Sequence, residues 1–188
     1  MTSEGVNLAK LIIFNKPFRV LSQFSDDGDR STLAQYIKIP AVYPAGRLDY
    51  DSEGLLLLTD NGYLQSKISH PRHKLKKTYW VQVEGQVNKQ HCVALRQGVE
   101  LKDGRARALS CKILPEPRLW ERNPPIRVRK SIPDSWLEIT VNEGRNRQIR
   151  RMSAAIGLPT LRLVRVSIGS WRLNDLRPGE YHLQSVDI

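Results

Sequence analysis

The chain has 188 residues, with 30 Lys and Arg against 19 Asp and Glu, so its formal net charge is +11 at pH 7. This length suits one domain or two tightly joined halves, and the charge favours a polyanionic partner through counterion release. Cys92 and Cys111 lack CxxC spacing, so they indicate buried thiols and neither a disulfide framework nor a zinc site. No apolar run approaches the ~20 residues of a membrane span and no signal peptide is evident, so we expect a cytoplasmic protein.

The first half of the chain is predicted to hold short strands and short helices. Four consecutive leucines at residues 55–58 are bounded by Gly54 and a Thr-Asp-Asn-Gly run, which indicates a fully buried strand. Residues 62–69 are predicted to be helical, because Pro71 stops a helix. The remaining predicted elements are strands at residues 11–14 and 20–24, on either side of Lys16-Pro17, and a short helix at residues 32–37 capped by Ser31.

The second half alternates in the same way. The predicted strands are residues 78–83, 106–114 and 136–141, and a helix is predicted at residues 89–96, ending before Gly98. A further helix follows Gly144, with Ile149, Met152 and Ile156 on one apolar stripe, and Gly157 and Pro159 end it. The proline-rich connection at residues 115–133 is either a substrate-selecting element or a disordered insertion.

Asp49 is the candidate catalytic residue of the first half. It lies in the run AGRLDYDSEGLLLLTDNG, residues 45–62, directly before the predicted buried strand. A carboxylate on a loop that a rigid element holds in place is typical of catalytic side chains. Asp, Asn and Gly clusters before a strand are also common turn chemistry, so both interpretations stay open on the pattern alone.

Basic residues gather in two tracts. Residues 144–174 contain seven arginines and no Asp or Glu, and residues 67–77 combine lysines and Arg72 with His70 and His73. Guanidinium groups match phosphate geometry in a bidentate way, so the tracts favour a groove that binds a nucleic-acid backbone. A basic surface that only aids solubility is the alternative. The two histidines have no third ligand at a useful spacing, so we expect no metal site.

The run at residues 45–62 resembles the signature of the bacterial pseudouridine synthases that act on ribosomal RNA. Three further segments resemble that family in the same order: residues 11–24, 76–85 and 143–169. The resemblance implies an α+β pseudouridine synthase fold, in which a central, mostly antiparallel sheet in two halves surrounds one catalytic cleft, with flanking helices. It also implies a single catalytic domain over residues 1–188 with two subdomains. Only about ten residues precede residue 11, so we expect no S4-type RNA-binding domain.

The resemblance assigns roles to individual residues. Asp49 would be the nucleophile, Tyr79 would stack on the flipped uracil, Arg150 would form a salt bridge with Asp49, and Leu163 would close the pocket. It also implies an enzyme without metal or cofactor, in which Asp51 and Glu53 shape the loop. The expected RNA-binding residues are Arg47, Lys16, Lys76, Lys77, Arg145, Arg147, Arg151 and Arg165.

The expected function is therefore isomerisation of one specific uridine in 23S ribosomal RNA by a monomeric cytoplasmic enzyme that flips the base. Residues 123–133 resemble the large-subunit enzymes of this family. A non-catalytic rRNA-binding assembly protein is the main alternative, because the basic tracts alone would suffice for it. A metal-dependent nuclease is a second alternative.

Overall fold

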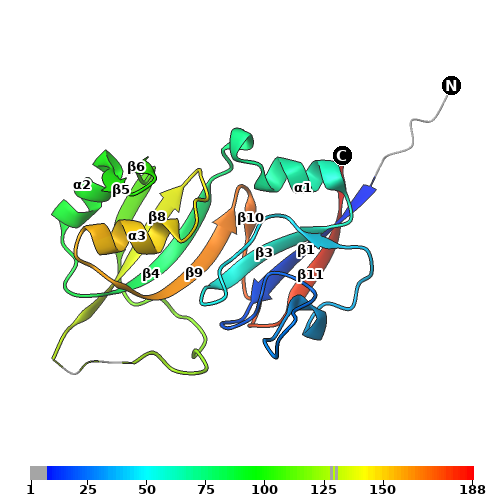
Figure 1. Ribbon diagram of the computed structural model, residues 1–188, viewed down its shortest axis with the longest axis horizontal. Coiled ribbons are helices and arrows are strands. Elements are labelled where there is room, and N and C mark those ends of the chain that lie inside the picture. Colours follow the sequence, from blue (N-terminus) through cyan, green and yellow to red (C-terminus); the bar gives the residue numbers. More distant parts are fainter. Residues whose placement is uncertain (1–7, 128, 130) are drawn as a thin grey trace. The chain divides into compact units, whose positions relative to one another are not determined.

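The computed structural model describes residues 8–127, 129 and 131–188. The chain divides into two compact units. One comprises the described residues up to His73 together with Trp171–Ile188, and the other is Lys74–Ser170. Each unit contains antiparallel strand pairs with helices beside them, which confirms the predicted α+β class (Figure 1). Within the described residues, no helix is long and apolar enough to cross a membrane.

The first unit is built around one fully buried strand. β3 (Glu53–Thr59) has all seven residues buried, which confirms the strand predicted from its leucines. It pairs with β1 (Leu8–Lys16), and β1 pairs on its other side with β11 (Tyr181–Asp187). The short β2 (Tyr43–Pro44) also pairs with β3. All these pairs are antiparallel. The buried aliphatic and aromatic residues of β1 and β3 form the centre of the unit.

Two helical elements of the first unit begin at side-chain caps. α1 (Gly62–Ser69) has the predicted bounds, and the Asn61 side chain accepts a hydrogen bond from the Leu64 amide. The predicted helix at residues 32–37 is only a 3-10 turn, η1 (Leu33–Gln35), and Thr32 rather than Ser31 caps it. The remaining short elements of this unit are η2 (Pro71–His73) and β10 (Trp171–Arg172).

The strand predicted at residues 20–24 is wrong. Val20 makes only an isolated bridge to Ser31. The Ser22 hydroxyl bonds to the backbone of Leu48. Residues 20–24 therefore form a loop that contacts the loop containing Leu48. Its apolar residues do not belong to a strand.

The second unit contains a four-stranded antiparallel sheet. Its strands lie in the order β9 (Thr160–Ile168), β4 (Lys77–Glu84), β8 (Asp134–Val141) and β7 (Ser110–Leu114). β4 and β8 confirm the predicted strands and extend them slightly. The prediction of one strand over residues 106–114 is wrong. The segment forms two separate strands. One ends at Ala106 and β7 begins at Ser110, because between them the Ala108 amide bonds to the Leu95 carbonyl instead of a neighbouring strand.

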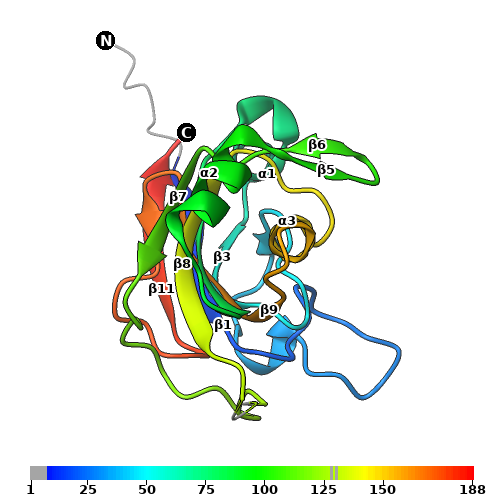
Figure 2. The same cartoon turned by 90° about the vertical axis from the view of Figure 1, so that its left-hand side faces the viewer.

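Two helices and a hairpin accompany this sheet. α2 (Lys89–Gln97) begins at an Asn88 capping box and contacts β7, beside which it lies in Figure 2. α3 (Gln148–Ala155) contacts β9 and the hairpin strand β5 (Val99–Leu101), which pairs with β6 (Gly104–Ala106). The sequence did not predict this hairpin.

The described part of the proline-rich connection is anchored to β9. Arg122 donates hydrogen bonds to the carbonyls of Pro124, at 2.9 Å, and Leu161, at 3.3 Å. The Arg162 guanidinium donates to the Trp120 carbonyl at 2.9 Å and stacks 5.6 Å from the centre of the Trp120 ring. Over these residues the connection is an ordered segment, which disfavours a disordered insertion. Residues 128 and 130 lie outside the described residues.

Candidate active site

Asp49 lies on a loop whose backbone is fixed on both sides. The Leu48 amide donates to the Ser22 hydroxyl at 3.0 Å, and that hydroxyl donates back to the Leu48 carbonyl at 2.7 Å. Beyond Asp49, the Arg19 amide bonds to the Tyr50 carbonyl at 2.8 Å, and the Ser52 amide bonds to the Asp49 carbonyl at 3.0 Å. The half-buried Asp49 side chain is therefore held at the entrance to β3.

The Asp49 loop also carries an exposed cation. Arg47 lies two residues before Asp49, and its one described side-chain bond is a long contact to Gln23 Oε1 of 3.3 Å. The Gly46 backbone has a φ of 88°, a conformation that a side chain at this position would strain. Arg47 is thus presented to solvent beside the candidate nucleophile.

Lys16 does not fit its predicted role as an RNA contact. Its side chain is fully buried, and its ammonium donates to the carbonyls of Pro17, at 2.8 Å, and Val20, at 2.7 Å. A cation in this position cannot reach a phosphate without unfolding the loop. Lys16 instead stabilises the turn that follows β1.

Tyr79 and Leu163 lie on one face of the second unit's sheet. Tyr79 on β4 pairs with Arg165 on β9, and Val81 pairs with Leu163. Directly paired residues share a face, and so do residues two apart along a strand. The exposed fractions are 8% for Tyr79, 4% for Leu163 and 3% for Arg165. The register therefore brings the predicted stacking residue and the predicted pocket residue together.

The pairing of β4 with β9 is irregular next to Tyr79. The register shifts between Thr78 and Tyr79, so one extra β9 residue, Val166, lies between their partners. Bulges of this kind redirect side chains and are common beside active sites. Lys77 is close to the irregularity, and burial, followed by the charge of Arg165, lowers its pKa. The neighbouring Lys76 is exposed.

α3 presents its predicted apolar side to the unit. Ile149 and Met152 are 4% and 0% exposed, and Ile156 is partly buried, which confirms the predicted stripe. Arg150 lies on the flank of this helix and is partly buried. The N-terminal residue Arg147 has a φ of 49°, a left-handed conformation that is uncommon for long side chains and occurs often at functional sites.

Two predicted RNA contacts instead hold the β5–β6 hairpin. Arg145 donates to the carbonyls of Gly104, at 2.9 Å, and Arg105, at 2.7 Å. Arg151 forms a bidentate pair with Asp103, at 2.6 and 3.0 Å, and this hydrogen bonding lowers the pKa of Asp103. These bonds give the two arginines a structural role in the hairpin, and their predicted contact with RNA stays a prediction.

The candidate residues are therefore distributed as follows. Asp49 and Arg47 belong to the first unit, whereas Tyr79, Arg150 and Leu163 belong to the second. In the part of the chain that the structure describes, no three His, Cys, Asp or Glu side chains are grouped so that they could hold a metal ion. The chemistry available is that of a carboxylate, an aromatic ring and guanidinium groups.

The chain is similar to several known proteins over most of its length. It is 59% identical over 171 residues to the ribosomal large subunit pseudouridine synthase E of Xanthomonas axonopodis pv. citri, covering 89% of this chain and 90% of the relative. It is 58% identical over 182 residues to the protein of the same name from Vibrio vulnificus, covering 96% of this chain and 78% of the relative. A solved structure described as a pseudouridylate synthase superposes with a TM-score of 0.74 at 30% identity, covering 94% of this chain and 70% of that one.

The family-level match includes the loop and strands described above. Residues 10–155 match the family described as RNA pseudouridylate synthase, a range that contains Asp49, Tyr79 and Arg150. This range is most of the chain, and the named relatives are isomerases. The chain accordingly belongs to the RNA pseudouridine synthase family.

Proposed function

We propose that this protein converts a specific uridine of 23S ribosomal RNA to pseudouridine, with Asp49 as the nucleophile. The observation that carries the proposal is the 58–59% identity to synthases named for the large ribosomal subunit, over 89–96% of this chain. The fixed loop that carries Asp49 at the entrance to β3 supports the same assignment.

The reaction needs no redox cofactor or group donor. The bond between N1 of uracil and C1′ of ribose breaks, the uracil turns over, and C5 bonds to C1′. The C5 proton leaves to solvent, and N1 takes up a proton from solvent. Carboxylates serve as nucleophiles in comparable chemistry at the anomeric carbon. Asp49 supplies this group, and exclusion of water protects the intermediate from hydrolysis.

Tyr79 and Leu163 are proposed to hold the flipped base. A uridine cannot be reached while it is stacked in RNA, so the enzyme must extrude it into a pocket. An aromatic side chain that stacks on a base contributes ~1–3 kcal/mol. The buried face that Tyr79 shares with Leu163 offers a ring and an apolar neighbour for this purpose.

Arg150 is proposed to pair with the Asp49 carboxylate and to orient it. A charge-assisted bond between guanidinium and carboxylate fixes both groups. The exposed cations Arg47, Lys76 and Arg147 are proposed to contact phosphates around the target nucleotide. Nothing in this mechanism needs a second copy of the chain, so we propose a monomer acting in the cytoplasm, where ribosomal RNA is available.

The variant Asp49→Asn tests the proposal. On unmodified 23S rRNA labelled with tritium at uracil C5, this variant is expected to lose tritium release and to bind the RNA as the parent does. Asp29→Asn, which changes an exposed carboxylate in the same unit, is the matched control and should keep its activity. Unchanged release by Asp49→Asn would refute the nucleophile. A parent protein that binds but releases no tritium would favour the assembly-protein alternative.

A further inference from the structure

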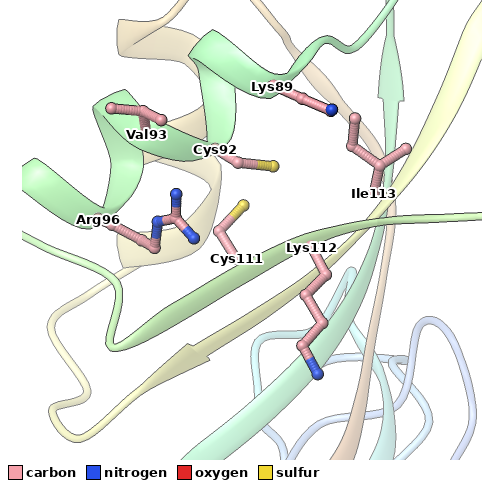
Figure 3. A pocket seen from close by; sticks show the side chains of 7 residues that line it. All are labelled: Lys89, Cys92, Val93, Arg96, Cys111, Lys112 and Ile113. Atoms are coloured by element: carbon pink, nitrogen blue, oxygen red, sulfur yellow. The ribbon is translucent and has the colours of Figure 1, made fainter.

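A groove lies between α2 and β7, on elements to which the proposed mechanism gives no role. On the α2 side it is lined by Lys89, Cys92, Val93 and Arg96, which follow the i, i+3, i+4, i+7 spacing of one helix face. On the β7 side it is lined by Cys111, Lys112 and Ile113, and its volume is about 400 Å³ (Figure 3). We call it the α2–β7 groove.

The groove has a cation at each end of its helical side. Lys89 and Arg96 are exposed and seven residues apart on α2, so they are separated by about 10 Å along the helix axis. Among the described residues, neither side chain takes part in a salt bridge to a carboxylate. In the view of Figure 3 the ammonium of Lys89 lies near Ile113, and the guanidinium of Arg96 lies near Cys111. These charges are therefore available to an anionic ligand.

The floor of the groove is apolar and uncharged. Val93 and Ile113 leave 39% and 46% of their surfaces exposed, although both are large aliphatic residues. The sulfur atoms of Cys92 and Cys111 point toward each other between α2 and β7 (Figure 3). Burial, followed by a hydrogen bond from Cys92, raises the pKa of Cys111, so its thiol stays neutral. The groove lining therefore contains no negatively charged side chain that would repel a bound phosphate.

The β7 residue Cys111, which lines the groove, shares a face of the sheet with Tyr79. Cys111 on β7 pairs with Ile139 on β8, and Ile139 pairs with Tyr79 on β4, so the three residues form one row. Neighbouring strands are ~4.8 Å apart, which places β7 about 10 Å from β4 across the sheet. A strand of RNA with one base at Tyr79 can therefore place a flanking nucleotide in the groove.

We propose that the α2–β7 groove binds a single-stranded nucleotide of the RNA substrate, beside the target uridine. The base lies on Val93 and Ile113, and the flanking phosphates contact Lys89 and Arg96. This inference rests on the proposed function, because it takes the RNA substrate of that function as the ligand of the groove. A nucleic acid suits the site better than an acidic peptide, because an apolar floor between two cations matches a base between two phosphates.

The double variant Lys89→Ala/Arg96→Ala tests the electrostatic half of the proposal. Its affinity for unmodified 23S rRNA transcript is expected to fall about tenfold, and the slope of log K against log salt is expected to fall by about 1.4 for two lost single-strand contacts. The effect on catalysis should be a raised KM for the transcript. Binding with the parent's affinity and salt slope would overturn the proposal.

Lys102→Ala is the matched control. Lys102 is an exposed lysine of the same unit, in the turn that joins β5 to β6, and it does not line the groove. Removal of this charge is expected to leave the affinity for the transcript unchanged. An equal loss in both variants would indicate a general charge effect and would overturn the groove.

A crosslinking experiment tests the base-binding half. Transcript containing 4-thiouridine is irradiated in complex with the protein, and crosslinked peptides are identified by mass spectrometry. Crosslinks are expected on Val93 or Ile113, and a glutamate oligopeptide of equal charge should not displace them. Displacement by that peptide, or crosslinks confined to other segments, would overturn the proposal. Asp49→Asn should give the same crosslinks, so failure of the nucleophile assignment and failure of the groove are separable.

Discussion

Tyr79 and Arg165 face each other across the β4–β9 pair, and both side chains lie on the same face of the sheet. Only 3% of Arg165 is exposed, so its guanidinium is enclosed beside the tyrosine rather than presented to solvent. This burial disfavours the predicted direct contact of Arg165 with RNA. The same buried charge contributes to the lowered pKa of Lys77.

Replacement of the Tyr79 ring is expected to weaken catalysis. Tyr79→Ala should lower kcat/KM for C5-tritium release by about 5- to 150-fold, the equivalent of losing ~1–3 kcal/mol of stacking. Tyr79→Phe keeps the ring and should retain most of that stacking. Thermal melting of both variants separates this loss from unfolding, because the tyrosine is also buried. Equal activity of the two variants would contradict a stacking role.

Loss of the Ser22 hydroxyl is expected to loosen the Asp49 loop. Ser22→Ala removes the group that bonds to both the amide and the carbonyl of Leu48, and an unsatisfied buried polar group costs ~1–3 kcal/mol. Urea unfolding should show this destabilisation, and kcat should fall because the Asp49 backbone is less well fixed. Ser25→Ala, at an exposed serine of the same segment, is the control. A fully stable, fully active Ser22→Ala protein would show that the loop does not depend on this pair.

The sequence predicted elements best where capping and breaking residues mark their ends. Asn61 and the segment before Pro71 bound α1, and Gly98 follows α2, so both helices agree with the prediction to within a residue. β11 was missed because its burial pattern alternates only between exposed and partly buried residues, so its hydrophobic signal is weak. Long-range pairing with β1 makes it a strand.

The candidate site was predictable only in part, because residue type does not reveal burial. The register places Tyr79 and Leu163 on one face of the sheet, whereas the burial of Lys16 could not be inferred from its charge. The β5–β6 hairpin was not predicted, because a contact that holds it joins residues far apart in the sequence. Arg151 reaches Asp103 across 48 residues of sequence, and no local pattern signals such a pair.

Removal of the Lys16 ammonium is expected to affect stability rather than RNA binding. Lys16→Met keeps an unbranched chain of similar length but leaves the carbonyls of Pro17 and Val20 without this donor. The free energy of unfolding should fall, and the salt slope of binding to 23S transcript should stay the same, since no phosphate contact is lost. A salt slope that falls by the amount expected for one lost phosphate contact would show that Lys16 does contact the RNA.

The Arg151–Asp103 pair is expected to stabilise the hairpin in a pH-dependent way. Hydrogen bonding to Arg151 lowers the pKa of Asp103, so its contribution is fully present above the unfolded value of about 3.9 and is lost as the pH falls through the lower folded value. Asp103→Asn should therefore melt below the parent at pH 7, and the difference should disappear in acid below pH 4. The side chains of the pair are 32% and 47% exposed, so the shift in melting temperature should be small. The double charge reversal Asp103→Arg/Arg151→Asp should recover part of the loss at pH 7. If the difference persists undiminished at acid pH, the hairpin is held by the Arg145 contacts to backbone carbonyls and not by this ion pair.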